Sequence, residues 1–309
     1  MQLTQHILMI RPAQFRMNEQ TVINNYFQIS PALPPADVIN KAQEEFDNFV
    51  DVLMAKGVQV TVVQDTEDPD TPDALFPNNW VSFHADGTVA LYPMFAENRR
   101  LERREAILEL LEEGGFIIDQ VMDYTTAEDA GIFLEGTGSL ILDRVHNKAY
   151  CALSTRADEE LFIEFCEDFE YTPVIFKAFQ TVGQKRLSIY HTNVMMCLAE
   201  SFAVICLDSI DNTKERKAVL AHLKEDGKEI IAISEDQMHH FAGNMLQVLG
   251  DNNTPYLVMS TSAFKSLNSN QLVKIAQHCE IIHSDLHTIE TAGGGSARCM
   301  MAEVFLPRI

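Results

Sequence analysis

The strongest constraint in this sequence is a unit of secondary structure that recurs five times at a nearly constant interval. Strands that follow helices are predicted to begin near residues 58, 116, 173, 229 and 280, which places them 51 to 58 residues apart. Each unit is predicted to contain strand, strand, helix and strand in that order. The units do not resemble one another in sequence, so the repeat is structural and indicates a repeat architecture.

No linker rich in Pro, Gly or Ser separates the units, and residues 1–309 are therefore predicted to form one domain. We expect an α/β fold in which five ββαβ units surround a common axis with pseudo-five-fold symmetry. Loops at one end of such an axis come from different units and meet in space. A site built there would draw a residue or short motif from each of several units.

Four expected elements bear directly on the position of such a site. We expect a helix over 97–113 in the second unit and a first strand over 187–198 in the fourth. The fifth unit is expected to begin with a strand over 254–260. The apolar run before Pro307 follows three glycines, which predicts a glycine loop that leads into a strand with Cys299 at its start.

Composition and charge limit the classes of function. Hydrophobic residues make up 46% of the chain, which is enough for a globular core. The net charge of −22 repels phosphate backbones and anionic lipid surfaces, so nucleic-acid and membrane binding are disfavoured. The N-terminal residues have no signal architecture, and no apolar run reaches the length of a membrane span, so we expect a soluble cytoplasmic protein. The six cysteines form no CxxC pair, which disfavours a zinc or disulfide framework.

Four unusual stretches lie at or near the start of a strand in different units, and the five-fold arrangement predicts that they converge. They are Phe76–Trp80, Phe133–Ser139, Tyr190–Asn193 and Gly293–Met301. Each has an ordinary explanation if it is taken alone, such as a turn, a core histidine or a buried thiol. Together, however, they supply the side chains of a nucleophilic catalytic site.

Cys299, His191 and Glu135 are the predicted catalytic residues. A cysteine serves as a nucleophile, a histidine as a proton shuttle and a carboxylate as the group that orients the histidine. Because the thiolate is the reactive form, we expect an imidazolium or another positive charge beside Cys299.

These stretches carry a resemblance to a known group of enzymes. Glu135-Gly136, His191-Thr192-Asn193 and the run from Gly293 to Cys299 resemble the three catalytic signatures of the pentein superfamily. That superfamily includes arginine deiminases, dimethylarginine dimethylaminohydrolases and glycine amidinotransferases. The resemblance covers essentially the whole chain, is closest to the citrulline-utilisation hydrolase branch, and implies a five-bladed αβ propeller.

The resemblance also implies a mechanism. Cys299 would attack the central carbon of a guanidino or ureido group, and His191 would protonate the leaving amine and then activate water. Glu135 would hold His191 and contact a nitrogen of the substrate. The covalent intermediate would be an S-alkylthiouronium from a guanidine or an S-carbamoyl enzyme from a urea.

Two arginines are candidate substrate-binding residues under the same resemblance. Arg156 lies where relatives carry a Ser-x-Arg that binds the α-carboxylate of the substrate, a group that a bidentate arginine suits. Arg298 is a second candidate partner for a carboxylate or for the thiolate. The alternative is that Arg156 is a surface residue at a helix start and that Arg298 faces solvent.

Three asparagines depart from the pattern of the arginine deiminases. Those enzymes carry an aspartate before the second unit and another two residues after the histidine, where this chain has Asn79 (or Asn78) and Asn193. An amide keeps the shape of a carboxylate without its charge, and it offers both a donor and an acceptor. We therefore hypothesise a neutral ureido substrate such as citrulline, unless another carboxylate such as Asp73 compensates.

The sequence leaves two rival functions open. An amidinotransferase would pass the same covalent intermediate to an acceptor amine, and a pentein-fold binding protein would have no catalysis. The predicted partner is a small guanidino or ureido amino acid, and assembly into a homo-oligomer is left open. We expect no metal or other cofactor, because the thiol mechanism needs none.

Overall fold

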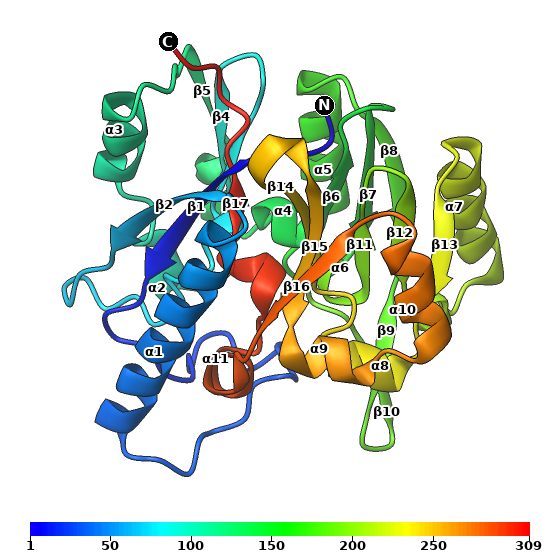
Figure 1. Ribbon diagram of the computed structural model, residues 1–309, viewed down its shortest axis with the longest axis horizontal. Coiled ribbons are helices and arrows are strands. Elements are labelled where there is room, and N and C mark those ends of the chain that lie inside the picture. The colour runs from blue at the N-terminus through cyan, green and yellow to red at the C-terminus, as the bar shows by residue number, and fades with distance from the viewer.

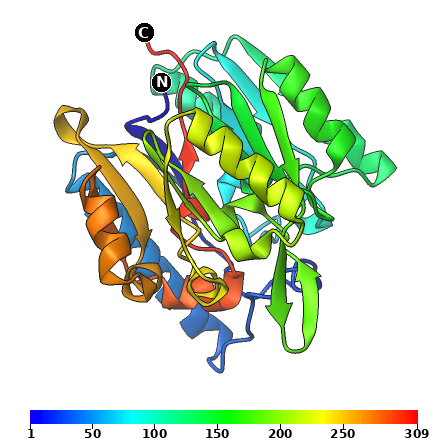
Figure 2. The same cartoon turned by 90° about the vertical axis from the view of Figure 1, so that its right-hand side faces the viewer.

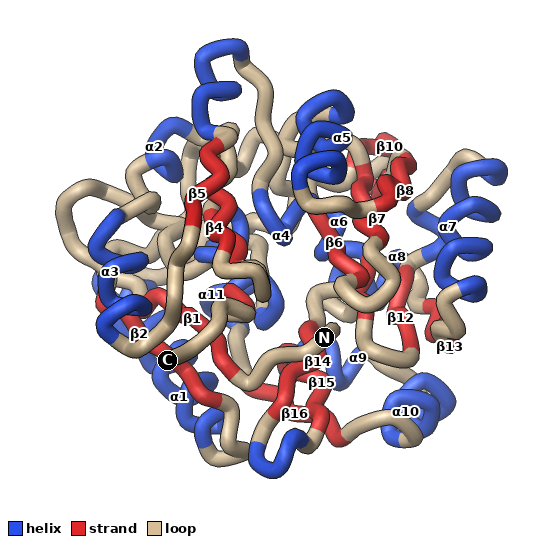
Figure 3. The backbone as a smooth tube through the Cα atoms, turned by 90° about the horizontal axis from the view of Figure 1, so that it is seen from above, coloured by secondary structure: helices blue, strands red, loops and turns tan.

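Each predicted unit forms a small sheet of three strands, whose middle strand pairs antiparallel with one neighbour and parallel with the other. The computed structural model, which describes residues 1–309, arranges the five sheets around a central axis (Figure 3). The first three sheets are β17 (Ala302–Glu303), β1 (His6–Arg11) and β2 (Gln59–Gln64); β3 (Val81–Phe83), β4 (Thr88–Leu91) and β5 (Gln120–Asp123); and β6 (Leu140–Asp143), β7 (Lys148–Ala152) and β8 (Thr172–Phe176). The other two are β11 (Met196–Leu198), β12 (Phe202–Ile205) and β13 (Glu229–Ala232); and β14 (Leu246–Leu249), β15 (Pro255–Ser260) and β16 (Glu280–Ser284). The α/β propeller of five ββαβ units is confirmed.

Helices join the middle strand of each sheet to its parallel neighbour and lie on the outside of the ring (Figure 3). Two parallel neighbours require such a crossover, because a tight turn cannot join them. The principal crossover helices are α1 (Pro35–Met54), α3 (Glu105–Glu113), α5 (Glu159–Asp168), α7 (Thr213–Glu225) and α10 (Ser269–Ala276). The shorter helices are α2 (Glu97–Arg100), α4 (Gly136–Ser139), α6 (Thr192–Met195), α8 (Glu235–His239), α9 (Thr261–Ser266) and α11 (His287–Gly293).

The two ends of the chain share one sheet, and this pairing closes the ring. β17 pairs antiparallel with β1, with Ile7 opposite Glu303 and Leu8 opposite Ala302. The C-terminal strand therefore supplies the first strand of the first unit. With β17 in place the first sheet has three strands like the other four. The pairing also brings β17 and the turn before it to the centre of the molecule (Figure 1).

Three of the expected elements differ in the structure. The strand expected over 187–198 is divided, because Lys185–Ser188 is β10 of a separate hairpin with β9 (Phe179–Val182), and β11 begins only at Met196. This hairpin projects from the end of the molecule opposite the two termini (Figures 1 and 2). Residues 189–195 are buried and contain the short helix α6 at 192–195, so their burial does not come from a strand.

The other two differences concern the second and fifth units. The helix expected over 97–113 is two helices, α2 and α3, with a break over 101–104. The fifth unit begins with β14, which was not predicted, and the strand expected over 254–260 is its second strand, β15. β14 has only four residues, and three in a row are buried, so no alternation of buried and exposed positions marks it in the sequence.

Apolar side chains fill the spaces between neighbouring sheets and between each sheet and its helix. α1, for example, buries Phe46 and Phe49 fully against the first sheet and its neighbour. No helix combines the length and the apolar composition that crossing a membrane requires.

The closure of the ring predicts a large effect of Leu8→Ala. Leu8 is fully buried on β1 beside β17, so its truncation is expected to lower the free energy of unfolding by about 2–5 kcal/mol. Val62→Ala on the neighbouring strand β2, where the side chain is 39% exposed, is the control and should cost about 0.5 kcal/mol or less. Urea unfolding measures both, and equal effects would contradict this assignment of the core.

Candidate active site

Five loops, one from each unit, converge at one end of the axis. They precede β3, β6, β11, β14 and β17, and each leads into the first strand of a sheet. Asn79 and His191 line one cavity together with Cys299. Glu135 reaches the same place through its contact with His191. The structure thus brings together all three predicted catalytic side chains.

Glu135 and His191 form a fully buried pair. A carboxylate oxygen of Glu135 lies 2.7 Å from Nε2 of His191. The carboxylate also accepts hydrogen bonds from the backbone N–H of Phe95 at 3.0 Å and from Arg156 at 3.4 Å. Burial alone would raise the pKa of Glu135, but Arg156 and the His191 bond hold that pKa well below its usual range. Glu135 is therefore a stable carboxylate.

The same pair fixes which nitrogen of His191 is reactive. A carboxylate can only accept a hydrogen bond, so Nε2 of His191 is protonated and donates to Glu135. Burial lowers the pKa of His191 to about 4, against the opposing effect of Glu135, so the ring is neutral near pH 7 and Nδ1 has a free lone pair. A Cβ at Gly138 would lie 2.9 Å from Nδ1, which explains a glycine beneath the ring.

Cys299 lies on a short 3-10 turn (Ala297–Met300), not at the start of a long strand as expected. The three glycines end α11 and allow close packing: Gly294 has a φ of 61°, and a Cβ at Gly293 or Gly295 would lie 2.9 Å from the ring of Phe76. The chain becomes a strand only for the two residues of β17. The backbone at Cys299 therefore forms a turn, where we expected the start of a strand.

Amide groups, not a positive charge, contact the sulfur of Cys299. Nδ2 of Asn193 lies 3.4 Å from Sγ and Nδ2 of Asn244 lies 3.2 Å from it. The neutral His191 supplies no imidazolium, and the two side-chain groups that donate to the sulfur are these amides. Amide N–H donors can still stabilise a thiolate, because a hydrogen bond to the charged form favours that form.

Asn79 presents an amide donor to the cavity. Its side-chain oxygen accepts a hydrogen bond from Arg99 at 2.8 Å, while Nδ2 has no partner in the protein. Arg99 itself is buried and paired with Glu102. Neither amide atom of the buried Asn78 has a partner, but Asn78 does not line the cavity. Of the two asparagines, Asn79 is the one placed to meet a substrate.

The two predicted substrate-binding arginines are both occupied by protein groups. Arg156 is buried, contacts Glu135 and donates to the side chain of Asn24 and the carbonyl of Thr21. It lines the cavity, but its main contacts hold Glu135 and the N-terminal loop.

Arg298 points away from the cavity, which corrects its predicted role. Its guanidinium donates to the backbone oxygen of Met301 and to the carboxylate of Glu303, both at 2.8 Å. Arg298 therefore contacts neither the sulfur nor the substrate space through its side chain. The 3-10 turn over 297–300 separates the directions of the Arg298 and Cys299 side chains, since successive residues in such a turn point about a third of a turn apart.

A loop over residues 18–28, here called the covering loop, closes the cavity. Asn25 and Gln28 donate from their side-chain amides to the backbone oxygen of Gly293 at 3.3 Å and 3.0 Å. The enclosed space is about 10 Å³, which holds one water molecule. Asp73 lines it with one carboxylate oxygen unpartnered, and burial raises the pKa of Asp73 against the effect of Arg99.

Sequence reasoning overlooked Arg99 entirely and did not name Asn244 among the site residues. Asn244 belongs to Phe241-Ala242-Gly243-Asn244, a segment that resembles one bordering the site in pentein enzymes and that a helix cap and turn explain equally well. Its position before β14 would have marked it, but β14 itself was not recognised. Arg99 gave no signal, because it is one of several charged residues in an amphipathic stretch.

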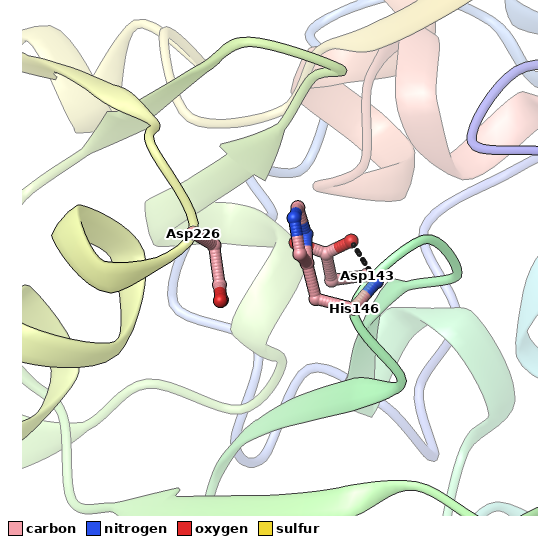
Figure 4. Close-up of side chains that lie close together, drawn as sticks. All are labelled: Asp143, His146 and Asp226. Carbon is pink, nitrogen blue, oxygen red and sulfur yellow. Dashed lines mark hydrogen bonds and ion pairs between the residues drawn. The ribbon is translucent and has the colours of Figure 1, made fainter.

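One group of side chains has spacing that a metal ion would accept, and it lies outside the cavity. Asp143, His146 and Asp226 face one another between the third and fourth sheets (Figure 4). Lys228 lies 3.1 Å from Asp143, and Lys148 lies 2.7 Å from Asp226. Since two ammonium groups already neutralise the carboxylates, the group is an ion-pair network that joins two sheets.

Comparison with known proteins relates the whole chain to guanidino-group enzymes. A family model of eukaryotic N,N dimethylarginine dimethylhydrolases matches residues 11–306. ArgZ, an arginine dihydrolase from the ornithine–ammonia cycle in cyanobacteria, is 17% identical with a TM-score of 0.74 over 98% of this chain and 41% of its own. AgrE, solved with ornithine and NAD+, is 16% identical with a TM-score of 0.73 over 98% of this chain and 40% of its own.

A smaller relative is similar over its full length. A dimethylarginine dimethylaminohydrolase, solved as an adduct with S-methyl-L-thiocitrulline, is 17% identical with a TM-score of 0.64 and covers 97% of this chain and 99% of its own. At these identities the structural likeness shows a shared fold. The chain spans about two fifths of full-length ArgZ and AgrE. No curated protein matches the sequence.

The glycine turn that carries Cys299 predicts a pH-dependent stability. Glu290 on α11 is buried and accepts a hydrogen bond from Ser296 at 2.6 Å, and burial raises the pKa of Glu290 to about 7. The folded state therefore binds more protons than the unfolded state between about pH 4.5 and pH 7. The contribution of Glu290 is complete below this interval and is lost as the pH rises through it.

The test compares the wild type with Glu290→Gln, which keeps the shape and removes the titration. The Gln variant is expected to gain up to about 3 kcal/mol of stability relative to the wild type between pH 5 and pH 8. Urea unfolding at each pH measures this difference. Glu109→Gln at an exposed position of α3 is the control and should follow the wild type. A constant difference between wild type and Glu290→Gln would refute the assignment.

Proposed function

We propose that this chain, which belongs to the eukaryotic N,N dimethylarginine dimethylhydrolase family, hydrolyses C–N bonds in amidino compounds. In this proposal Cys299 is the nucleophile, and the substrate is an arginine-like amino acid with a guanidino or ureido group. The observation that carries the substrate proposal is the amide of Asn79. Its oxygen is held by Arg99, and its Nδ2 is free in the cavity that Cys299 lines.

The first half of the proposed reaction uses the neutral His191. Nδ1 accepts the proton of the Cys299 thiol, and the sulfur attacks the central carbon of the substrate group to form a C–S bond. The tetrahedral adduct collapses, the bond from that carbon to the leaving nitrogen breaks, and Nδ1 delivers its proton to this nitrogen. Glu135 stabilises the imidazolium that forms in between, since it lies 2.7 Å from Nε2.

The second half returns the enzyme to its starting state. Water takes the place of the departed amine, Nδ1 of His191 removes a proton from it, and the resulting hydroxide attacks the carbon bound to sulfur. The C–S bond breaks and the sulfur leaves as a thiolate, which recovers the proton from His191.

Asn79 suits a ureido group better than a guanidinium. A guanidinium presents only N–H donors, whereas a ureido group also presents an oxygen that needs a donor. Arg99 donates to the side-chain oxygen of Asn79. A rotation of the amide by 180° would place its NH2 group against this donor, so the observed orientation is fixed. The free Nδ2 is therefore fixed as a donor toward the substrate space, where it matches a ureido oxygen.

Asp73 supports a substrate that carries a positive charge. One of its carboxylate oxygens accepts from Asn18 and Thr21, and the other lines the cavity without a partner. A buried, unpaired carboxylate oxygen is costly, and a cationic ligand removes that cost. An α-ammonium group or a guanidinium meets this requirement, which fits both arginine and citrulline as amino acids.

A panel of compounds tests the proposed reaction. Arginine, citrulline, methylated arginines and agmatine are incubated with the protein, with and without glycine as acceptor, and ammonia, ornithine and citrulline are measured. Wild type should release ammonia or an amine from at least one compound without need for glycine. Cys299→Ser should lose at least about 10³-fold in kcat while remaining folded. Undiminished activity in Cys299→Ser would overturn the mechanism.

The role of Asn79 has its own test. Asn79→Asp replaces the free donor by a charged acceptor, so the ratio of kcat/KM for citrulline to that for arginine should fall about 10- to 100-fold. Asn212→Asp, at the exposed N-cap of α7, makes the same chemical change far from the cavity and should leave the ratio unaltered. An unchanged or increased ratio in Asn79→Asp would count against the ureido proposal.

A further inference from the structure

The fifth unit contributes a side chain to the sulfur of Cys299 that no catalytic signature in the sequence identifies. Asn244 is fully buried in the loop before β14, and its Nδ2 lies 3.2 Å from Sγ. This loop occupies the place in its unit that the loops of Asn79, Glu135 and His191 occupy in theirs. With Asn244 included, every unit supplies one residue to the same end of the axis.

The hydrogen bonds of Asn244 determine which of its side-chain atoms faces the sulfur. The oxygen accepts from the backbone N–H groups of Arg298 at 3.0 Å and Cys299 at 3.4 Å. Both of these partners are donors, so the oxygen must be on their side. Nδ2 then donates to the backbone oxygen of Asn193 at 3.1 Å and to Sγ of Cys299. All the capacity of this amide is used, and its orientation is unambiguous.

The second amide at the sulfur, from Asn193, is held less firmly. Its Nδ2 lies 3.4 Å from Sγ, and its side-chain oxygen is buried without a partner. That oxygen is available to a substrate N–H group, and an amide that binds substrate can turn. Asn244 therefore provides the donor to the sulfur that persists through the reaction.

The backbone around Asn244 is constrained in a way that holds this position. Phe241 has a φ of 62°, which a bulky residue rarely adopts, and its backbone oxygen accepts from the N–H of Asn244 at 2.9 Å. A Cβ at Gly243 would lie 2.2 Å from the backbone oxygen of Val194, so the loop packs directly on the α6 turn that carries Asn193. Unfavourable backbone geometry of this kind persists where the surrounding structure determines it.

We propose that Asn244 is a further catalytic residue, whose amide N–H stabilises the thiolate of Cys299 and orients a lone pair of the sulfur toward the cavity. The side-chain oxygen of Asn244 holds the turn on which Cys299 lies. The proposal rests on Cys299 being the nucleophile of the proposed function. It assigns to an amide the stabilisation that a cation supplies at many reactive cysteines. A neutral donor suits this site, because a cation in the same place would repel a guanidinium substrate.

The test measures the sulfur directly, without a substrate. Iodoacetamide modifies the protein from pH 5.5 to pH 9.5, and mass spectrometry of the peptide that contains residue 299 gives the rate at that cysteine. Asn244→Asp keeps an oxygen for the two backbone N–H groups and replaces the donor at the sulfur by a negative charge. The pH midpoint of alkylation should rise by at least about one pH unit, and kcat/KM at pH 7 should fall at least about tenfold.

Two further variants make the result decisive. Asn244→Ser has too short a side chain to reach the sulfur and should shift the midpoint in the same direction, so it serves if Asn244→Asp does not fold. Asn212→Asp, remote from the site, should retain the wild-type midpoint. A midpoint that stays at the wild-type pH in a folded Asn244 variant, even with reduced activity, would show a purely structural role and overturn the proposal.

The two proposals fail separately. If the wild type hydrolyses none of the guanidino and ureido compounds but its alkylation midpoint depends on Asn244, the substrate proposal is rejected and the role of Asn244 is retained. If the compounds are hydrolysed and the midpoint does not depend on Asn244, only the role of Asn244 is rejected.

Discussion

The pairing of β17 with β1 is the constraint on which the catalytic arrangement depends. It draws the last residues of the chain into the first sheet, and the turn just before β17 carries Cys299. Glu135 and His191 come from the third and fourth units, so the nucleophile meets them only when the ring is closed. A chain with an open ring would keep five sheets with most of their helices and would lose the site. The closure of the ring and the proposed catalysis thus depend on the same two-residue strand.

Burial gives the site its electrostatic character. His191 is almost fully buried, which keeps it neutral and leaves Nδ1 as a base, while Arg156 keeps Glu135 ionised. The guanidinium of Arg156 thereby acts on the catalytic pair, whereas a substrate carboxylate was its expected partner. The sulfur in turn is surrounded by amides, which carry dipoles without a net charge. An arrangement with few free charges around the sulfur is compatible with both a cationic guanidino group and a neutral ureido group.

Much of this arrangement was predictable from the sequence, and the failures have physical causes. The interval of the repeat predicted the propeller, because each sheet with its crossover helix needs a similar length of chain. Cys299, His191 and Glu135 were recognisable because each is a reactive residue in an unusual local setting. β14 was not predicted because it has only four residues, and without it the segment that contains Asn244 is explained equally well as a helix cap and turn. The strand expected over 187–198 was wrong because a buried segment with the short helix α6 divides β10 from β11.

The sequence by itself determined the repeat, the apolar segment before Pro307 and the identity of the reactive side chains, since these follow from local pattern and chemistry. Only the tertiary structure decided which side chains face the cavity. Arg298 is adjacent to the nucleophile in sequence yet donates to Glu303 on the other side of the turn, while Asn244 is distant in sequence and contacts the sulfur. Side-chain direction in a turn depends on backbone dihedral angles that packing imposes. Hydrogen bonds between units, such as those of Asn79 and Asn244, exist only after the units meet.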